Sequence, residues 1–272
     1  MPAHLPASSS LSSHLRAALL LLLALLAACS PASPPNPLTE GVCGASFAYG
    51  RPAHALPETQ FLCRKGYAVL HDNGRKVPLY SAQQLRAEAL DGSVARTDDF
   101  RPDPELLEGQ RAELGDYRNS GYDRGHMAPA GDFSTDPQAM SESFLLSNMV
   151  PQNGTMNSGI WAGLESATRA CARSVGAIYV LTGPVFEGTP RAIGTNQVAV
   201  PSHLYKIILE AQGGDSRAYL MPNTALPAQG GGFTQYRVSI DEVERRTGLD
   251  FFPGGQVLED GLGTLCKNTF GT

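Results

Sequence analysis

The sequence has few of the features that mark a membrane span, a zinc site or a second domain. Its most apolar segment, residues 17–28, contains only Ala and Leu and is shorter than the about 20 residues of a membrane-spanning helix. No Cys-x-x-Cys or His-x-x-x-His spacing occurs, as a structural zinc site would need. The chain also lacks an internal repeat and, beyond its N-terminal part, a linker rich in Pro, Gly and Ser. These absences favour a single domain that folds around an apolar core.

Positive charge is also scarce. The 21 Lys and Arg residues are outnumbered by 26 Asp and Glu, which gives a net charge of −5. Removal of an N-terminal leader whose only formal charge is Arg16 would leave about −6. Proteins that coat nucleic acid non-specifically are usually basic, because counterion release supplies most of their affinity. The composition therefore disfavours such a coating protein, but it leaves room for an enzyme with a local positive patch.

The N-terminus is typical of an export signal. His14 and Arg16 precede the apolar run of residues 17–28, whose length fits the core of a signal peptide. The run ends in Leu26-Ala27-Ala28-Cys29, which resembles the lipobox of bacterial lipoproteins. Cys29 is therefore the expected lipidated first residue of the mature chain. An ordinary secretory signal, cleaved nearby, is the alternative.

The expected organisation has three parts: a lipoprotein signal peptide over residues 1–28, a Pro/Ser-rich tether over residues 29–38 and a domain over residues 39–272. The mature protein is expected outside the cytoplasm, as a lipoprotein of the bacterial envelope or cell surface. Ser30 follows Cys29 at the position where Asp is associated with retention in the inner membrane, and this favours the outer membrane.

Four cysteines remain in the domain, and an even number in an exported chain indicates two disulfide bonds. They are Cys43, Cys63, Cys171 and Cys266, and sequence alone allows three connectivities. We favour Cys43–Cys63, which closes a short N-terminal loop, together with Cys171–Cys266, which would tie down the C-terminal tail.

The pattern of apolar residues predicts strands in runs with a few helices, which is typical of an α+β domain. The pair Asn73-Gly74 lies between the apolar runs 67–70 and 77–82 and predicts a hairpin. Further strands are expected at residues 177–182, 198–200, 204–210 and 217–221.

The clearest expected helix covers residues 155–173, and its period places Asn157, Trp161 and Glu165 near one face. Two shorter helices are expected from their cap residues. They cover residues 137–144, after Asp136, and residues 240–247, before Gly248.

The stretch with the densest polar chemistry is Asp123-Arg124-Gly125-His126, which is expected at a strand end or in a loop. It places the fixed positive charge of Arg124 beside His126, which titrates near neutral pH. Hydrolysis of a phosphodiester needs a base for water, a cation on the non-bridging oxygens and stabilisation of the leaving alkoxide. His126, a metal ion at Asn157 and Arg124 would meet these needs. Glu165 would hydrogen-bond the waters of the metal.

These residues and several later blocks resemble the DNA/RNA non-specific endonuclease family, the ββα-metal nucleases. The resemblance begins with residues 123–126, 147–152 and 157–165. It continues through residues 180–184, 200–206, 221–223 and 244–252, and so covers most of the domain. It implies a central antiparallel β-sheet layered with helices, and an active-site finger made of a strand pair and the Asn157 helix.

The resemblance implies a catalytic role for five residues. His126 corresponds to the general base, and Glu165 to the residue that orients metal-bound water. Asn157 corresponds to the protein ligand of Mg²⁺, with Mn²⁺ as an alternative ion. Arg124 corresponds to the arginine of the motif, and Arg96 to an upstream arginine that stabilises the transition state.

Asp123 and Asn148 correspond to positions that brace the site by hydrogen bonds, and Gln152 is grouped with them as a supporting residue. The implied substrates are DNA and RNA; the lipid at Cys29 makes the membrane a partner, and a homodimer is left open. Two other functions are weighed: an envelope protein that captures nucleic acid without cutting it, and a phosphodiesterase for small esters. Structural roles are weighed as well, with Asn157 as a helix cap, Glu165 on a solvated face and Trp161 as core packing.

Overall fold

The computed structural model describes residue 1 and residues 43–212, 214–227, 232–253, 257 and 263–270. Apart from Met1, these residues belong to one compact unit, Leu38–Thr272. The expected signal peptide, the tether and Cys29 lie outside the described residues. Within the described part, no helix is both long and apolar enough to cross a membrane.

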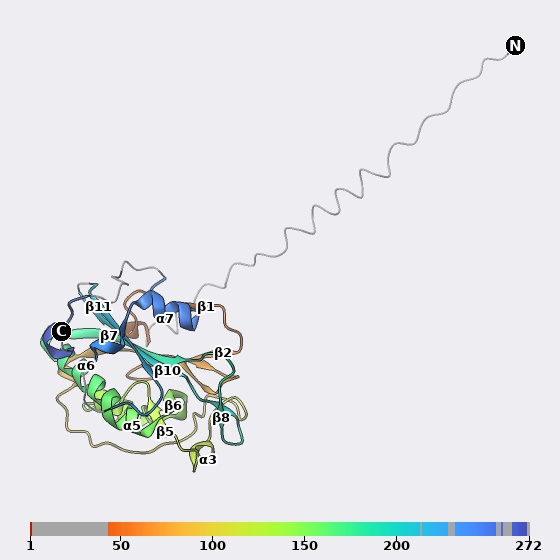
Figure 1. Ribbon diagram of the computed structural model, residues 1–272, viewed down its shortest axis with the longest axis horizontal. Coiled ribbons are helices and arrows are strands. Elements are labelled where there is room, and N and C mark those ends of the chain that lie inside the picture. The colour runs from red at the N-terminus through yellow and green to blue at the C-terminus, as the bar shows by residue number, and fades with distance from the viewer. Residues whose placement is uncertain (2–42, 213, 228–231, 254–256, 258–262, 271–272) are drawn as a thin grey trace. The chain divides into compact units, whose positions relative to one another are not determined.

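A seven-stranded sheet forms the centre of the domain, and neighbouring strands pair antiparallel (Figure 1). This confirms the predicted α+β class with a central antiparallel sheet. In spatial order its strands are β12 (Arg237–Val238), β11 (Ser216–Pro222), β10 (His203–Glu210), β7 (Ala177–Val185), β4 (Val77–Arg86), β3 (Ala68–Asp72) and β2 (Thr59–Cys63).

Three strand pairs lie outside this sheet: β1 (Ala53–His54) with β13 (Leu249–Asp250), β5 (Asp123–His126) with β6 (Met149–Gln152), and β8 (Ala192–Ile193) with β9 (Val198–Ala199). The α-helices are α3 (Leu114–Tyr117), α4 (Pro137–Glu142), α5 (Gly154–Met156), α6 (Ala162–Val175), α7 (Ile240–Thr247) and α8 (Lys267–Phe270). Short 3₁₀ turns are η1 (Gly44–Ser46), η2 (Ala87–Ala89), η3 (Ala130–Asp132), η4 (Leu146–Asn148) and η6 (Thr234–Tyr236).

The two faces of the sheet bury two different apolar cores, because successive residues of a strand point to opposite faces. On one face, Ile208 of β10 packs in the core that contains Trp161 and Leu164 of the α6 region. On the other face, Ile207 packs in the core that contains Val243 of α7. Helices α6 and α7 therefore cover opposite faces of the sheet (Figure 1).

Local sequence signals placed several elements correctly. The predicted hairpin is β3–β4, and its turn is held by Asp72, whose Oδ1 accepts a hydrogen bond from the Arg75 backbone N–H at 2.8 Å. Asp136 caps α4 by accepting from two backbone N–H groups, as expected. Gly248 ends α7 in the left-handed region at φ 72°, which a glycine adopts without the penalty of a Cβ.

The long helix expected over residues 155–173 is wrong as a single element. The chain forms the short helix α5, then a π-helical turn, η5 (Asn157–Trp161), and then α6. Gly159 leaves helical geometry inside this turn at φ −100° and ψ −107°. A glycine tolerates this departure, and single π turns of this kind occur often at functional sites.

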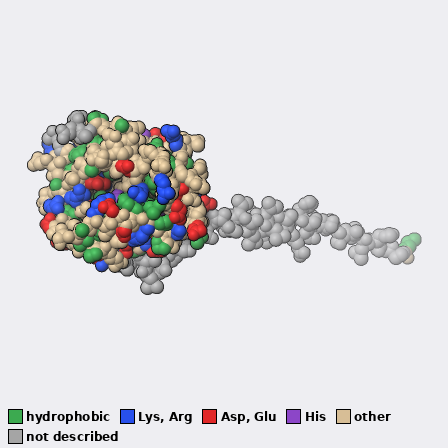
Figure 2. Space-filling view, turned by 90° about the horizontal axis from the view of Figure 1, so that it is seen from below, with side chains coloured by type: hydrophobic (Ala, Val, Ile, Leu, Met, Phe, Trp, Pro, Cys, Tyr) green, Lys and Arg blue, Asp and Glu red, His purple; other side chains and the backbone are tan. Residues whose placement is uncertain are grey.

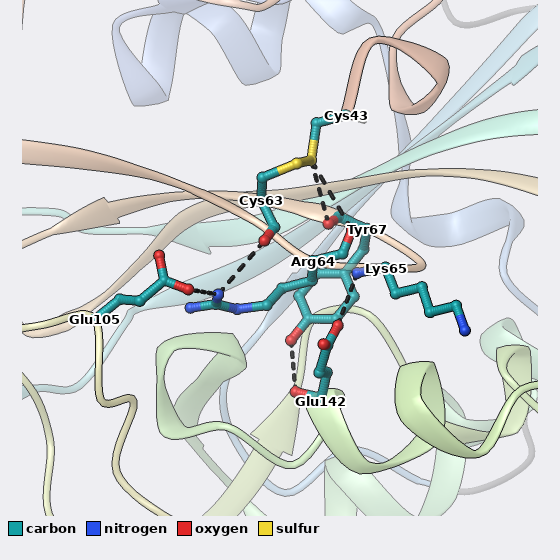
Figure 3. Close-up of a disulfide and its surroundings, with 7 residues drawn as sticks. All are labelled: Cys43, Cys63, Arg64, Lys65, Tyr67, Glu105 and Glu142. Atoms are coloured by element: carbon teal, nitrogen blue, oxygen red, sulfur yellow. Dashed lines mark hydrogen bonds and ion pairs between the residues drawn. A yellow bond between two sulfur atoms is a disulfide. The ribbon is translucent and has the colours of Figure 1, made fainter. Parts of the chain in front are cut away.

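Both favoured disulfides are confirmed. Cys171 of α6 bonds to Cys266 near the C-terminus, a separation of 95 residues, and Cys43 bonds to Cys63 over 20 residues. Figure 3 shows the Cys43–Cys63 bond beside Arg64, whose guanidinium pairs with Glu105. The N-terminal edge of the domain is thus joined covalently to the end of β2.

Candidate active site

The Asp123–His126 tetrad forms β5, and β5 pairs with β6 so that His126 lies opposite Met149 and Asp123 opposite Gln152. Gly125 must be a glycine here, since a Cβ would lie 2.0 Å from Oε1 of Gln152. Gln152 is fully buried and donates from Nε2 to Sδ of Met156 at 3.2 Å. The side chain expected to support the site therefore packs beneath the strand that carries His126.

His126 sits in an aromatic and cationic environment. Its ring packs edge-on against Phe144, with centroids 5.0 Å apart, and lies 5.6 Å from the Phe100 ring. The guanidinium of Arg124 stacks over Phe100 at 4.1 Å, and that of Arg96 over Phe144 at 4.7 Å. Burial, reinforced by the positive charges of Arg96 and Arg124, lowers the pKa of His126 to about 3. The imidazole is therefore neutral at physiological pH.

Asn148 braces the turn that follows the tetrad, as predicted. Its Oδ1 accepts from the Ala128 backbone N–H at 2.9 Å and from the Ser81 hydroxyl at 2.8 Å. Its Nδ2 donates to the carbonyl oxygens of Ala128 at 2.8 Å and Ser143 at 2.9 Å. A fully buried amide that uses both of its ends in this way fixes the backbone directly after His126.

Asn157 lies at the first position of the π turn, and its Nδ2 donates to Oδ2 of Asp123 at 3.0 Å. The helix cap is Asn153 instead, whose Oδ1 accepts from the backbone N–H groups of Thr155 and Met156. Asn157 is therefore not the cap that was considered for it. Because its amide N–H₂ is turned towards Asp123, its Oδ1 remains as an acceptor with no partner among the described residues.

Glu165 lies on α6, with Trp161 one turn before it fully enclosed in the core, as expected for a packing residue. Burial raises the pKa of Glu165 to about 7. The positive charge of Lys206 opposes this rise most strongly, followed by that of Arg169, whereas the negative charge of Asp132 adds to it. Glu165 is thus a partly buried carboxylate, not a member of a solvated helix face.

All of the expected catalytic residues line one cleft of about 770 Å³. Arg96, Arg124, His126, Asn157 and Glu165 are joined there by the bracing residue Asp123. A second part of the lining, the α3 wall, consists of Leu114, Tyr117, Arg118 and Tyr122, from α3 and the residues after it. The geometry thus gathers a neutral base, an amide oxygen, a carboxylate and cations around one space.

Residues 46–258 match the family described as DNA/RNA non-specific endonuclease. The chain belongs to this family. Nuclease C1 of Cunninghamella echinulata var. echinulata is 37% identical over 225 residues, which span 77% of the chain and 88% of that nuclease. Mitochondrial endonuclease G of Homo sapiens is 38% identical over 223 residues, 75% of the chain and 72% of the relative.

Among solved structures, the complex of EndoG with EndoGI, described as showing the mechanism of EndoG inhibition, resembles the fold with a TM-score of 0.71. The two chains are 30% identical, and the match covers 83% of this chain and 95% of the other. Together with the family match, this establishes an enzyme of the DNA/RNA endonuclease class on the α+β fold with a central antiparallel sheet that the sequence predicts.

Several residues of this endonuclease site were not predicted. Phe100 and Phe144, which enclose His126, come from segments without a recognisable motif. Arg169 follows Glu165 by one helical turn, and this spacing was a usable signal. Lys206 carried another signal, since it is the one charged side chain between His203 and Glu210 in an otherwise apolar strand.

Proposed function

We propose that the chain is a Mg²⁺-dependent, sugar-non-specific endonuclease that hydrolyses phosphodiester bonds of DNA and RNA, with Mn²⁺ as an alternative ion. The observation that carries this proposal is the shared cleft, in which the neutral imidazole of His126 faces the same space as the amide of Asn157 and two arginines. A neutral base and a single amide oxygen beside arginines suit attack of water on a phosphodiester anion.

The donor set fits a Mg²⁺ ion that keeps most of its waters. Asn157 offers one neutral oxygen, and its orientation is fixed by the hydrogen bond from Nδ2 to Asp123. No group of three His, Cys, Asp or Glu side chains suited to a metal occurs among the described residues, so an all-protein cage is not the kind of site available in that part of the chain. When bound, Mg²⁺ supplies a Lewis acid that withdraws charge from the phosphate and its leaving oxygen.

His126 acts as the base in the proposed mechanism. Its Nε2 is enclosed and has no hydrogen-bond partner in the described part of the chain, so Nδ1 is the nitrogen left to meet water in the cleft. Nδ1 accepts a proton from a water molecule, and the oxygen of that water attacks phosphorus in line with the leaving oxygen. With O3′ as the leaving oxygen, the P–O3′ bond breaks, the 3′ oxygen takes a proton from solvent, and the phosphate stays on the 5′ end.

The two arginines hold the phosphate and stabilise the charge that develops on it. The guanidinium of Arg124 stacks on Phe100 and forms no ion pair with a described residue. Arg96 pairs with Asp98 at 2.6 Å, and this pair is half-exposed, so the arginine can exchange its partner for a phosphate. Both charges also keep His126 unprotonated before the reaction.

The cleft is also suited to a polymer, because its α3 wall offers contacts beyond the reacting phosphate. Arg118 is exposed on this wall, and its guanidinium has no ion-pair partner among the described residues. Leu114 is an exposed apolar side chain of the same wall. Figure 2 shows one face of the domain on which Lys and Arg are interspersed with Asp and Glu. A local cation in a cleft, and not a continuous basic surface, therefore supports substrate binding.

We place the enzyme in the bacterial envelope, held by a lipid on Cys29 and favouring the outer membrane. Support comes from the order of the leader, the lipobox-like residues and Ser30. Incorporation of labelled palmitate that is lost in Cys29→Ser would agree with this location. Labelling of the variant would contradict it. A homodimer stays a prediction, which the mass of the detergent-solubilised chain would test.

Plasmid DNA and a long RNA are the substrates that test the proposed activity. The full chain is incubated with each in Mg²⁺ and in EDTA, and cleavage is expected only with Mg²⁺. Retardation of the plasmid on a gel without cleavage would instead indicate a capture protein. Faster turnover of bis-nitrophenyl phosphate than of any nucleic acid would indicate a small-ester phosphodiesterase.

A further inference from the structure

A lysine occupies a core position of the central sheet directly behind the active site. Lys206 is only 1% exposed, and it lies between Leu204 and Ile208 on the face of β10 that packs against Trp161 and Leu164. Removal of an ammonium group from water costs several kcal/mol unless opposite charges and hydrogen bonds compensate. An apolar residue would fill this position with a smaller desolvation penalty. The presence of a charge here therefore indicates a role beyond packing.

The ammonium group is held in one place. Lys206 pairs with Thr182 across the β10–β7 ladder, and its Nζ donates to Oγ1 of Thr182 at 2.7 Å. Nζ also lies 5.2 Å from the centre of the Trp161 ring, on the turn that leads into α6. The position of the charge is therefore fixed from the sheet on one side and from the helix that carries Glu165 on the other.

Three charged groups on two elements act electrostatically on this ammonium. They are Glu165 and Arg169 of α6 and Asp132 of η3. Arg169 is already paired with Asp132 at 3.0 Å, and Gln83 donates to the second oxygen of that carboxylate at 2.5 Å. Because Asp132 already has Arg169 as its ion-pair partner, Glu165 is the carboxylate whose charge acts most strongly on Lys206.

We propose that Lys206 is a positioning residue of the active site, whose buried ammonium supplies the counter-charge that holds Glu165 as a carboxylate in the cleft. The inference rests on the proposed nuclease function where it is tested by kinetics. Its test by titration of Glu165 does not depend on that function. The mutual effects agree with it: burial lowers the pKa of Lys206, and Glu165 is the charge that raises it most in return. Lys206 likewise opposes the burial that raises the pKa of Glu165.

The physical test titrates Glu165 directly. The full chain, labelled with ¹³C at Glu carboxyl groups and kept in detergent and EDTA, is followed by NMR over pH, and Glu165→Gln identifies the resonance. Removal of a nearby opposite charge should raise the Glu165 midpoint by about 1–3 pH units in Lys206→Met. Lys206→Arg, which keeps the charge, should restore part of the wild-type midpoint. An unchanged midpoint in Lys206→Met would overturn the inference.

The kinetic test follows cleavage of a fluorogenic oligonucleotide at fixed Mg²⁺. In Lys206→Met the acidic limb of the kcat profile should move to higher pH, with kcat about 10–100-fold lower at pH 7 and KM little changed. The same substitution in a Glu165→Gln background should leave the pH profile where it is. A purely structural role predicts a uniform loss at every pH in both backgrounds, and that result would also overturn the inference.

Thr182→Val guards against the case in which Lys206→Met does not fold. It removes the hydrogen bond to Nζ and keeps the charge, so a smaller shift in the same direction is expected, and no shift would count against the role of Lys206. If the wild-type chain does not cut nucleic acid, the proposed function fails. The NMR midpoints then still decide the inference on Lys206 and Glu165.

Discussion

The wall of the cleft that carries His126 and the wall that carries Glu165 both hold a partly buried titratable group, yet the neighbours of these groups act in opposite ways. Around His126, burial and the charges of Arg96 and Arg124 all disfavour the protonated imidazole. Around Glu165, burial disfavours the carboxylate, but Lys206 and Arg169 favour it. Burial alone favours the neutral form of both groups. The nearby positive charges push His126 further towards its neutral form but favour the charged form of Glu165.

This difference matches the tasks of the two groups. A base must be unprotonated before it can accept a proton from water, and burial, with the charges of Arg96 and Arg124 adding to it, keeps His126 unprotonated over a wide range of pH. A carboxylate in the cleft is useful only when it is charged, and a pKa of about 7 places Glu165 at the margin of that condition. The protonation state of Glu165 should therefore be more sensitive to a change of one neighbouring charge than that of His126.

Replacement of His126 by alanine is expected to have the largest effect, because it removes the group that accepts the proton. The expected loss in kcat on plasmid DNA is about 10²–10⁴-fold, the usual contribution of a general base. Thermal unfolding should be close to that of the wild type. His203→Ala is the matched control, since His203 is a partly buried histidine outside the cleft. Normal activity in His126→Ala would refute the role assigned to this wall.

Replacement of Asn157 by alanine is expected to rank second. Loss of the oxygen that would hold the ion should lower kcat by about 10²-fold or more at subsaturating Mg²⁺, with partial recovery as Mg²⁺ is raised. Asn153→Ala is the contrasting variant: loss of its cap should cost about 1 kcal/mol of folding stability but leave the Mg²⁺ dependence unchanged. Identical Mg²⁺ curves for wild type and Asn157→Ala would exclude Asn157 as the ligand.

Replacement of Arg118 by alanine tests the α3 wall of the cleft. Because this guanidinium has no assigned part in the chemical step, KM for an oligonucleotide should rise while kcat changes less than about two-fold, and the slope of log(kcat/KM) against log[salt] should become shallower by about 1. Turnover of bis-nitrophenyl phosphate should not change. Arg191→Ala, an exposed arginine outside the cleft, serves as the control. An equal effect on the small ester would remove the argument for a polymer-binding wall.

The smallest expected effect is on stability against pH, and it has opposite signs for the two walls. His126, with its pKa lowered from 6.5 to about 3, makes the folded state less stable as pH falls below its unfolded value, because the unfolded chain then binds more protons. Glu165, with its pKa raised from 4.5 to about 7, makes the folded state less stable as pH rises through that window.

Urea unfolding of the metal-free chain at pH 5 and pH 7 would measure both contributions. His126→Asn should gain stability relative to wild type at pH 5, and Glu165→Gln should gain it at pH 7. The stability difference from wild type should therefore grow towards pH 5 for His126→Asn and towards pH 7 for Glu165→Gln; differences that grow in the same pH direction would show that the two walls respond alike.

Elements with strong local signals could be predicted from the sequence, whereas those decided by packing could not. The β3–β4 hairpin and the caps Asp136 and Gly248 depend on residues close to them in sequence, so a short segment was enough to predict each of them. The π turn was missed, because the apolar period through Trp161 is compatible with a continuous helix. Its first residue, Asn157, is held by Asp123 of β5, which lies 34 residues earlier in the sequence, and such a distant contact leaves no local pattern.

The sequence by itself determined the family, the tetrad, the helix residues Asn157 and Glu165, the four cysteines of the domain and the class of fold, whereas their pairing was settled by the structure. These features can be recognised from short motifs, from their spacing along the chain and from the resemblance to a family, without the three-dimensional structure. The tertiary structure decided the protonation states of the site, since Phe100 and Phe144 enclose His126, and the charge of Lys206 in the central sheet acts on Glu165 of α6. The pKa of each group depends on burial and on charges that only folding brings together. It therefore cannot be read from the catalytic motif alone.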